Sequence, residues 1–455
     1  MSGNFAMQKD LSEQYAAPVP RYTSYPTAPH FNASVTSQTY RDWLGALAAD
    51  TEISLYIHIP YCDRLCWFCA CHTRQILRYA PITRYLEALY KEIDTIGGLL
   101  ERRVAVRSVH FGGGSPTMLK PQDMVELDRR LRDAFQYMPD VEISVEIDPN
   151  DMEDARFDAL ARIGMTRVSL GVQDFDPRVQ AAINRQQSFE QTKAVVDGAR
   201  SRGVASVNLD LLYGLPHQTC DSIETTLRQA LSLKPDRIAL FGYAHVPWMK
   251  KHQTMIDEAA LPDAAQRFEQ ASRAGALIVA SGYEAIGLDH FALPGDSLAQ
   301  ANRAGTMRRN FQGYTVDPSD TLIGLGASSI GRLPQGYVQN CTATGEYERM
   351  VGETGLAAVR GYALSDDDRM RAWVIERLMC DFSFSQDQML DQFGDRARPI
   401  IEQAKLIATS DSDGCFVRRG DRFAVADHGR PLVRTIAARF DAYLGKGAAR
   451  HSAAV

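Results

Sequence analysis

The sequence predicts an α/β protein built on a partial (β/α)6-type, TIM-like barrel, with an irregular N-terminal arm and a small, mainly helical C-terminal domain. Two observations carry this prediction. Six short β-rich runs alternate with longer helical stretches, and polar or glycine-rich motifs stand where the runs end. Parallel strands joined by helices bring their carboxyl ends to one edge, where barrel active sites assemble. Six units favour a barrel or partial barrel over a short doubly wound sheet. The sequence does not decide whether the barrel closes.

The individual elements follow from periodicity and residue type. The expected strands are residues 53–57, 108–111, 142–147, 167–172, 206–211 and 237–242. Apolar residues at helical spacing predict helices at 82–103, 122–135, 155–163, 188–202 and 221–233. This alternation is typical of βα units on a parallel sheet.

The flanks of the predicted barrel have a different character. Prolines between residues 17 and 26 disfavour regular structure, so we expect residues 1–50 to form an irregular arm. The barrel domain is expected at 51–355. Beyond it, residues 356–455 are expected to form the C-terminal domain, with helices at 367–380 and 431–444 and strand-like runs at 415–418 and 423–425.

Composition excludes several functional classes. A chain of 455 residues suggests two or three domains, and its 45% hydrophobic and 23% charged residues are ordinary for a globular protein. A formal net charge of -6 and no long basic block give no reason to expect nucleic acid. The first residues lack a signal-peptide pattern, and no apolar stretch is long enough to cross a membrane. We therefore expect a cytoplasmic, reducing location.

Four cysteines fall within ten residues directly after the first strand: Cys62, Cys66, Cys69 and Cys71. One short loop can direct three thiolates at a single iron-sulfur cluster, and a fourth protein ligand is then optional. The alternative, a structural zinc site, usually pairs two short clips far apart in sequence, and no second clip exists here. The other cysteines are single and scattered, and we interpret them as small buried side chains: Cys220, Cys341, Cys380 and Cys415.

The loop pattern Cys-x3-Cys-x-Phe-Cys resembles the signature of radical S-adenosylmethionine enzymes. The longer string from Tyr56 to Cys71 is similar to the oxygen-independent coproporphyrinogen III oxidases. The likeness extends over nearly the whole chain, through similar segments at residues 21–27, 110–114, 171–175, 208–216, 287–291, 324–330 and 433–436.

The resemblance implies a [4Fe-4S] cluster on Cys62, Cys66 and Cys69, with one iron left open for S-adenosylmethionine. Electron transfer from the cluster would then yield methionine and a 5′-deoxyadenosyl radical. The positions implied to contact this first S-adenosylmethionine are Tyr56, Gly113, Glu146 and Ile330. The family holds a second molecule, and the matching positions are Phe68, Gly114, Ser115, Gln173, Arg185, Asp210 and Ala244.

Each of these positions has a simpler interpretation. The glycine run could be a tight βα turn, Glu146 and Asp210 could be helix caps or ion-pair partners, Arg185 a surface charge, and Phe68 plain core. The family more often has threonine where Ser115 stands, and serine keeps the hydroxyl. Taken together, the positions form one constellation at the strand ends.

Three residues are candidates for a catalytic role by the same resemblance. Cys71 is implied to be a non-ligand associated with activity, with a buried structural thiol as the alternative. His58 is a candidate that we interpret mainly as a satisfied histidine supporting the loop. Gln312 is a candidate for lining the substrate pocket.

The implied reaction is oxidative decarboxylation of two propionates of coproporphyrinogen III to vinyl groups, giving protoporphyrinogen IX without molecular oxygen. The implied partners are this substrate and an electron donor such as a flavodoxin or ferredoxin, with a monomeric protein and no membrane. The substrate's carboxylates predict arginines at the barrel mouth, with Arg21 and Arg309 as candidates. A related haem chaperone without decarboxylase activity is the alternative. Such relatives usually carry an aromatic residue in place of Cys71, and the arm motif at 21–27 also favours the oxidase.

Overall fold

The structure is a computed structural model, and it describes residues 18–100 and 102–446. Its main feature is a 12-stranded sheet in the order β16-β15-β14-β13-β1-β4-β5-β6-β7-β8-β10-β9. Seven neighbouring strands are parallel: β13 (Thr321–Leu325), β1 (Glu52–Ile59), β4 (Ala105–Gly113), β5 (Gln136–Ile147), β6 (Arg167–Gln173), β7 (Ser206–Tyr213) and β8 (Arg237–Gly242). Because β16 and β9 are the two ends of the sheet, the barrel is open. The prediction of an α/β partial barrel is confirmed.

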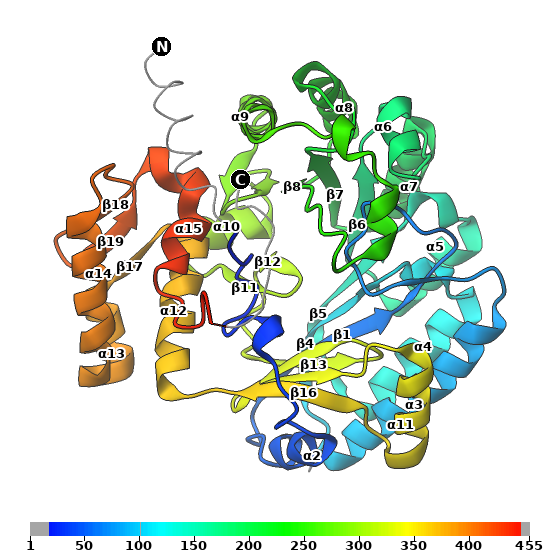
Figure 1. Cartoon of the computed structure of the whole chain (residues 1–455). Coiled ribbons are helices and arrows are strands. Elements are labelled where there is room, and N and C mark those ends of the chain that lie inside the picture. The colour runs from blue at the N-terminus through cyan, green and yellow to red at the C-terminus, as the bar shows by residue number, and fades with distance from the viewer. Residues whose placement is uncertain (1–17, 101, 447–455) are drawn as a thin grey trace.

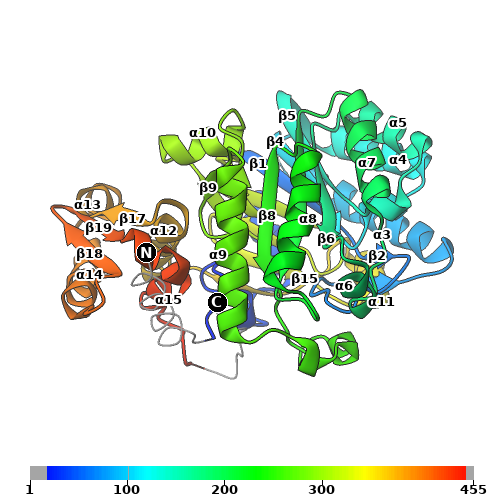
Figure 2. The same cartoon turned by 90° about the horizontal axis from the view of Figure 1, so that it is seen from above.

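Helices connect the parallel strands and cover the outer face of the sheet (Figures 1 and 2). They are α3 (Ala80–Leu99), α4 (Pro121–Ala134), α5 (Asp154–Ile163), α6 (Pro177–Ala182), α7 (Phe189–Ser201) and α8 (Cys220–Ser232). All six predicted strands and all five predicted helices are present, with bounds that differ by a few residues. None of the described helices is both long enough and apolar enough to span a lipid bilayer.

Several elements were not predicted. The parallel strand β13 is one of them, and antiparallel strands extend the sheet at both ends: β14 (Ile330–Leu333), β15 (Gly336–Asn340), β16 (Ala358–Ala363), β9 (Glu284–Ile286) and β10 (His290–Ala292). Among the described residues of the barrel domain, four helices were also not predicted: α6, α9 (Ala264–Ala280), α10 (Ser297–Ala304) and α11 (Thr344–Thr354). Two short pairs complete this part of the chain: β2 (Tyr61–Cys62) with β3 (Arg74–Gln75), and β11 (Arg308–Asn310) with β12 (Gly313–Thr315).

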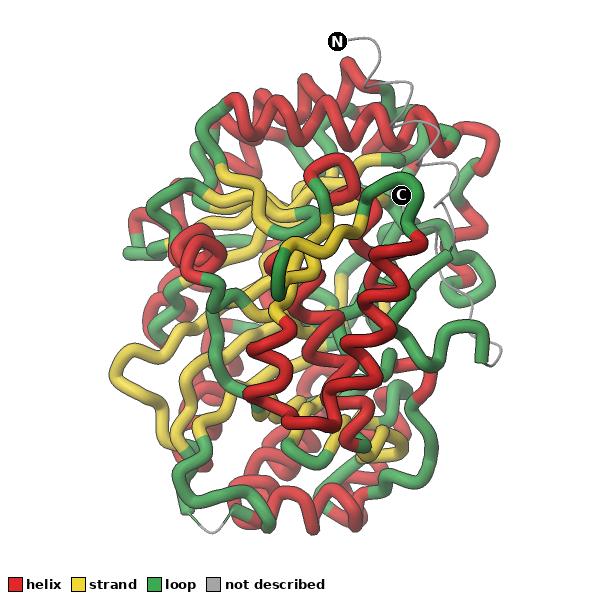
Figure 3. Tube along the Cα trace, turned by 90° about the vertical axis from the view of Figure 1, so that its left-hand side faces the viewer, coloured by secondary structure: helices red, strands yellow, loops and turns green. Residues whose placement is uncertain are grey.

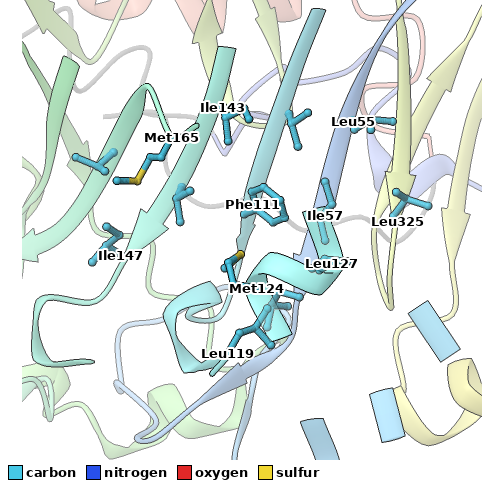
Figure 4. Packing of buried hydrophobic residues seen from close by; sticks show 14 of the residues in the cluster. Leu55, Ile57, Phe111, Leu119, Met124, Leu127, Ile143, Ile147, Met165 and Leu325 are labelled. Carbon is cyan, nitrogen blue, oxygen red and sulfur yellow. The ribbon is translucent and has the colours of Figure 1, made fainter. Parts of the chain in front are cut away.

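The parallel strands alternate apolar and polar residues, which separates the core from the barrel interior. In β1, Leu55 and Ile57 are fully buried and pack against the covering helices, as Figure 4 shows beside Leu127 of α4. Tyr56 and His58 lie between these residues in the strand, so they point to the opposite face, the barrel interior. The outer face therefore supplies the hydrophobic core, and the inner face is free to carry polar chemistry.

The N-terminal arm is irregular over residues 18–36, apart from the short 3-10 helix η1 (Ala28–His30). Ser37–Gly45 form helix α2, which corrects the expectation of an irregular segment up to residue 50. The helix forms because the prolines end at Pro29 and Thr36 then begins a capping box with Thr39. The arm is joined to the sheet where Asn32 bridges Gly361 of β16.

The C-terminal elements form a second hydrophobic cluster beside the barrel, on the side of the molecule that faces the viewer in Figure 3. They are α12 (Asp366–Asp381), α13 (Gln386–Phe393), α14 (Arg398–Ser410) and α15 (Val433–Ala438), with a sheet of β17 (Ser383–Ser385), β19 (Arg422–Val425) and β18 (Phe416–Arg419). Both strand-like runs are confirmed. The arm residues Val19, Tyr22 and Tyr25 belong to this cluster, so the arm is tied to the C-terminal elements.

The predicted helix at 431–444 is wrong in extent. Pro431 lies inside a 3-10 helix, η7 (Asp427–Leu432), and α15 that follows has only six residues. After it, the N–H groups of Arg439, Phe440 and Asp441 each bond the carbonyl three residues back. The backbone thus tightens into turns, because this bonding is of the 3-10 rather than the α type.

Candidate active site

The cysteine loop begins just after β1 and brings three thiols near polar partners. Thr73 Oγ1 lies 3.1 Å from Cys62 Sγ, and Arg185 Nη1 donates to Cys66 Sγ at 3.6 Å. The backbone N–H of Cys71 donates to Cys69 Sγ at 3.4 Å. Hydrogen bonds to sulfur orient metal-binding thiolates and tune the potential of an iron-sulfur cluster. Each of the three predicted ligands therefore has the polar support that a cluster ligand requires.

The ionisation of these thiols also suits a metal. Burial raises the pKa of Cys62 to about 12, and burial raises the pKa of Cys66 in spite of the nearby Arg185. A hydrogen bond with Cys71 lowers the pKa of Cys69. Two of the three thiols thus need a further positive charge to ionise, and a bound metal supplies that charge. The donor set fits an iron-sulfur cluster held by three thiolates.

Cys71 stands apart from the other three cysteines of the loop. Its side chain is exposed, whereas Cys66 is buried and Cys62 and Cys69 are partly buried. This exposure does not support the alternative of a buried structural thiol. The remaining cysteines are free, and Cys341, Cys380 and Cys415 are buried as expected. Cys220 is only partly buried, because it opens α8 at the protein surface.

A second loop, which the sequence did not single out, holds the cysteine loop by its backbone. Lys250 Nζ donates to the carbonyl of Cys71 at 2.9 Å, and His252 Nε2 donates to the carbonyl of Cys69 at 2.6 Å. Gln253 Nε2 donates to the carbonyl of Phe68 at 2.9 Å. These donors lie at the 3-10 helix η4 (Lys251–Met255), which follows β8. We call Lys250, His252 and Gln253 the loop clamp.

The backbone of the glycine motif at the end of β4 lies so close to neighbouring residues that side chains would not fit there. A Cβ atom on Gly113 would lie 2.7 Å from the His58 ring, and its φ of +118° disfavours any side chain. A Cβ atom on Gly114 would lie 2.6 Å from the Tyr61 carbonyl oxygen. Ser115 is buried, and its hydroxyl donates to Asp151 at 3.0 Å. The glycines let the strand end meet the start of the cysteine loop.

His58 uses both ring nitrogens within the protein. Its Nε2 donates to the carbonyl of His72 at 2.8 Å, so Nδ1 accepts from the Tyr56 hydroxyl at 3.0 Å. Burial lowers the pKa of His58, which favours the neutral ring. Both ring nitrogens of His58 thus have hydrogen-bond partners, and the residue links the strand to the cysteine loop.

Glu146 lies in β5, which is separated from the strand of His58 only by β4. Its carboxylate is bonded to His110 Nε2 at 3.1 Å and accepts the Gly113 N–H at 3.1 Å. Burial alone would raise the pKa of Glu146, but the hydrogen bonds from His110 and Gly113 hold it below its ordinary value. The group is therefore a carboxylate at neutral pH, which suits a cationic ligand atom. The simpler alternative of a helix cap does not apply, since Glu146 lies within β5.

Asp210 provides a second carboxylate on a neighbouring part of the barrel. It accepts from Ser169 Oγ at 2.9 Å and from Asn208 Nδ2 at 2.8 Å. Burial raises the pKa of Asp210 to about 6. The residue lies three positions before the end of β7, because that strand continues to Tyr213 rather than ending at 211.

Arg185 is a buried residue, so its interpretation as a surface charge is wrong. Nη1 pairs with Asp148 at 2.9 Å as well as with Cys66, and Nη2 donates to the carbonyl of Gly171. Gln173, predicted beside it, ends β6 with a φ of +68°. The guanidinium group thus links two strand ends to the cysteine loop.

The other predicted positions differ in how they relate to the cysteine loop. Ala244 follows β8, and its carbonyl accepts from Gln253 of the loop clamp at 3.2 Å. Ile330 begins β14 beside Gly324, whose register partner is Tyr56. Phe68 packs on a hydrophobic cluster near the loop, which supports its core alternative. Gln312 is exposed in the turn between β11 and β12, and among the described residues no hydrogen bond joins its side chain to the cysteine loop.

Comparison with known proteins decides the family. Residues 56–230 match the family model of the Radical SAM superfamily. The oxygen-independent coproporphyrinogen III oxidase of Bradyrhizobium diazoefficiens is 48% identical over 450 residues, covering 99% of this chain and 100% of that protein. The protein of the same name from Escherichia coli is 40% identical over 437 residues, covering 95% of each chain.

The chain belongs to the family of oxygen-independent coproporphyrinogen III oxidases. Its fold agrees with a solved structure described as coproporphyrinogen III oxidase (HemN) from Escherichia coli, a radical SAM enzyme. The TM-score is 0.89 at 38% identity, over 93% of this chain and 97% of that chain. The predicted family is confirmed, and membership of the radical SAM superfamily implies a [4Fe-4S] cluster and S-adenosylmethionine as cofactors.

Sequence reasoning missed several residues of this coproporphyrinogen oxidase site. His110 supports Glu146, Ser169 supports Asp210, and Lys250 and His252 hold the cysteine loop. His110 and Ser169 stand at polar positions in otherwise apolar strands, and this alternation was a usable signal. The loop clamp had no comparable signal, because its segment contains no regular hydrophobic period.

Proposed function

We propose that this protein catalyses the oxygen-independent oxidative decarboxylation of two propionate side chains of coproporphyrinogen III to vinyl groups, giving protoporphyrinogen IX. Full-length identity of up to 48% to the Bradyrhizobium diazoefficiens enzyme is the observation that carries this proposal. Two features of the site agree with this proposal. Polar groups lie beside the sulfur atoms of three cysteines in the cysteine loop, and the barrel interior is polar.

In this proposal Cys62, Cys66 and Cys69 would hold the cluster, and polar residues of the barrel interior would bind S-adenosylmethionine. When bound, the reduced cluster and S-adenosylmethionine supply a carbon radical able to abstract hydrogen from an unactivated propionate carbon. The chain's own residues position the reactants. The ionised Glu146 is suited to bind an ammonium group, and the absent side chain of Gly113 lets the strand end lie close to the His58 ring.

A second S-adenosylmethionine would occupy the neighbouring strand ends, near Asp210 and Ala244. A carboxylate such as Asp210 suits ribose hydroxyls or an ammonium group, and Ser169 and Asn208 hold it in place. Arg185 would act through the loop, because its hydrogen bonds already go to Asp148, Gly171 and Cys66. Cys71, exposed at the mouth of the barrel, would take part in turnover without binding iron.

The proposed setting follows from the same chemistry. The protein would act as a monomer in the cytoplasm and receive single electrons from a carrier such as a flavodoxin or ferredoxin. Thiolate ligands require a reducing compartment, because they must not pair as disulfides.

The test is an anaerobic assay of the reconstituted protein with reductant, S-adenosylmethionine and coproporphyrinogen III, with products separated by porphyrin chromatography. We expect protoporphyrin and a mono-vinyl intermediate. If the cluster is intact and reducible but neither product forms, the oxidase function is wrong. Tight haem binding under those conditions would instead support the chaperone alternative.

A further inference from the structure

A partly open cavity of about 270 Å³ lies at the carboxyl end of β8, beside the proposed cofactor positions. Its lining residues come from distant parts of the chain: Arg21 of the arm, residues of the barrel domain between 213 and 309, Phe382, and residues 430, 431 and 434 near α15. Ala244 lines this cavity and also accepts a hydrogen bond from the loop clamp. The cavity therefore opens toward the same strand ends as the cysteine loop.

The charges around this cavity are strongly unequal. Its lining includes five arginines and a single carboxylate, Asp289, which is bonded to His290 at 2.7 Å. One of the arginines, Arg430, pairs with Asp427 outside the cavity at 3.0 Å. The other four are Arg21, Arg267, Arg309 and Arg434.

Arg267 and Arg309 have buried donors that lack an acceptor. Arg267 Nε is buried and has no hydrogen-bond partner among the described residues. Arg309 is 8% exposed. Two of its guanidinium nitrogens, Nε and Nη1, are buried and have no hydrogen-bond partner among the residues that the structure describes. Buried polar groups are normally bonded, so two such arginines at one cavity require an explanation.

The positions of these arginines are fixed by contacts with the arm. Arg309 Nη2 donates to the carbonyl of Arg21 at 3.2 Å, and the Arg21 guanidinium donates to the carbonyl of Gly242 at 3.0 Å. Arg434 Nε donates to the carbonyl of Pro20 at 3.1 Å. The arm is thus held between the barrel and α15 in a way that places Arg21 at the cavity.

The electrostatics of the cavity favour an anion. Burial, together with the charge of the neighbouring Arg21, lowers the pKa of Arg267. Guanidinium groups that crowd together in this way are stabilised by a bound carboxylate, whose two oxygens match the planar arginine fork. The other lining residues are mainly apolar or aromatic, and they include Phe241 and Phe291. A carboxylate attached to an apolar ring fits both properties.

We propose that Arg21, Arg267 and Arg309 bind a propionate carboxylate of the tetrapyrrole substrate, with one pyrrole edge against the aromatic wall. This inference rests on the proposed function. At about 270 Å³ the cavity is smaller than sites that enclose a whole drug-sized ligand, so it takes one edge of the substrate. A larger cavity of about 1200 Å³ shares Arg309 and Phe382 with it and has room for the rest.

The carboxylate could also come from S-adenosylmethionine, and the experiment separates the two sources. The full-length reconstituted protein is titrated with coproporphyrin III, a stable tetracarboxylate, by fluorescence, and separately with S-adenosylmethionine by equilibrium dialysis. We expect Arg267→Gln to weaken coproporphyrin binding about tenfold or more and to leave S-adenosylmethionine binding within about twofold. Arg267→Lys should lose less, because it keeps the charge but not the fork.

The controls keep this inference falsifiable. Arg178→Gln, at an exposed arginine of α6, should bind both ligands as the wild type does. Arg21 is also exposed, so Arg21→Gln tests the same site with little risk to folding. Unchanged coproporphyrin binding in both Arg267→Gln and Arg21→Gln overturns the inference, as does a loss confined to S-adenosylmethionine. Because binding requires no turnover, a wild type that binds through Arg267 but forms no vinyl product would refute only the oxidase function.

Discussion

Replacing Arg185 with leucine should destabilise the barrel strongly, even without cofactors. Arg185 and Asp148 form an ion pair at 2.9 Å with side chains 10% and 11% exposed. Removing one partner of a buried pair leaves the other charge without compensation, which costs about 3–5 kcal/mol. The cost is increased by Asp63 and Asp151, whose carboxylate oxygens lie within 4.8 Å of that of Asp148. We therefore expect a loss at the upper end of this range.

The assay is urea unfolding of the cofactor-free chain, followed by tryptophan fluorescence and circular dichroism. Arg178→Gln, which removes an exposed arginine, is the matched control and should change stability by less than about 0.5 kcal/mol. The double variant Arg185→Leu with Asp148→Asn should recover part of the loss, because it removes the uncompensated charge. A loss below about 1 kcal/mol for Arg185→Leu would refute the reasoning that this pair holds the strand ends together.

Three further predictions concern the glycine motif, the buried carboxylate Glu92 of α3 and the loop clamp. Gly113→Ala should weaken S-adenosylmethionine binding in equilibrium dialysis and lower stability by roughly 1–3 kcal/mol, because the new Cβ atom would meet His58. Gly98→Ala is the control and should have neither effect, because the space around Gly98 is open. Burial raises the pKa of Glu92 to about 6, so between pH 4.5 and 6 the folded state keeps a proton that the unfolded chain releases. The free energy of unfolding should therefore fall by about 2 kcal/mol as the pH rises from about 4.5 to 6. Glu92→Gln should flatten this pH dependence in urea titrations. Lys250→Met should speed loss of iron to a chelator, whereas Lys251→Met, at a neighbouring exposed lysine, should not; equal rates would show that the loop clamp does not protect the cluster.

The βα part of the fold was predictable because its signals are local. The parallel strands β1, β4, β5, β6 and β7 each combine a β-rich run with a following helix of clear period. The strand β13 was missed because its five residues run into Gly326 and two serines, which is a pattern typical of a loop. The antiparallel ends of the sheet are three to six residues long, which is too short for periodicity to distinguish them.

The site was predictable only in part, for a related reason. The cysteine loop and the glycine motif are contiguous in sequence, so their chemistry can be inferred directly. Contacts such as His110 with Glu146 depend on the register between strands, and register is a property of the assembled sheet. The cavity formed by Arg21, Arg267 and Arg309 joins three distant segments, so no local pattern indicates it.

The central claim is that three cysteines hold the cluster and Cys71 does not. Its most direct test is the iron and sulfide content of reconstituted Cys71→Ser, measured with the electron paramagnetic resonance spectrum of the reduced protein before and after S-adenosylmethionine is added. We predict about four iron atoms per chain and a spectral change on adding S-adenosylmethionine, as in the wild type, whereas Cys62→Ala should lose both. Loss of iron from Cys71→Ser would contradict the claim.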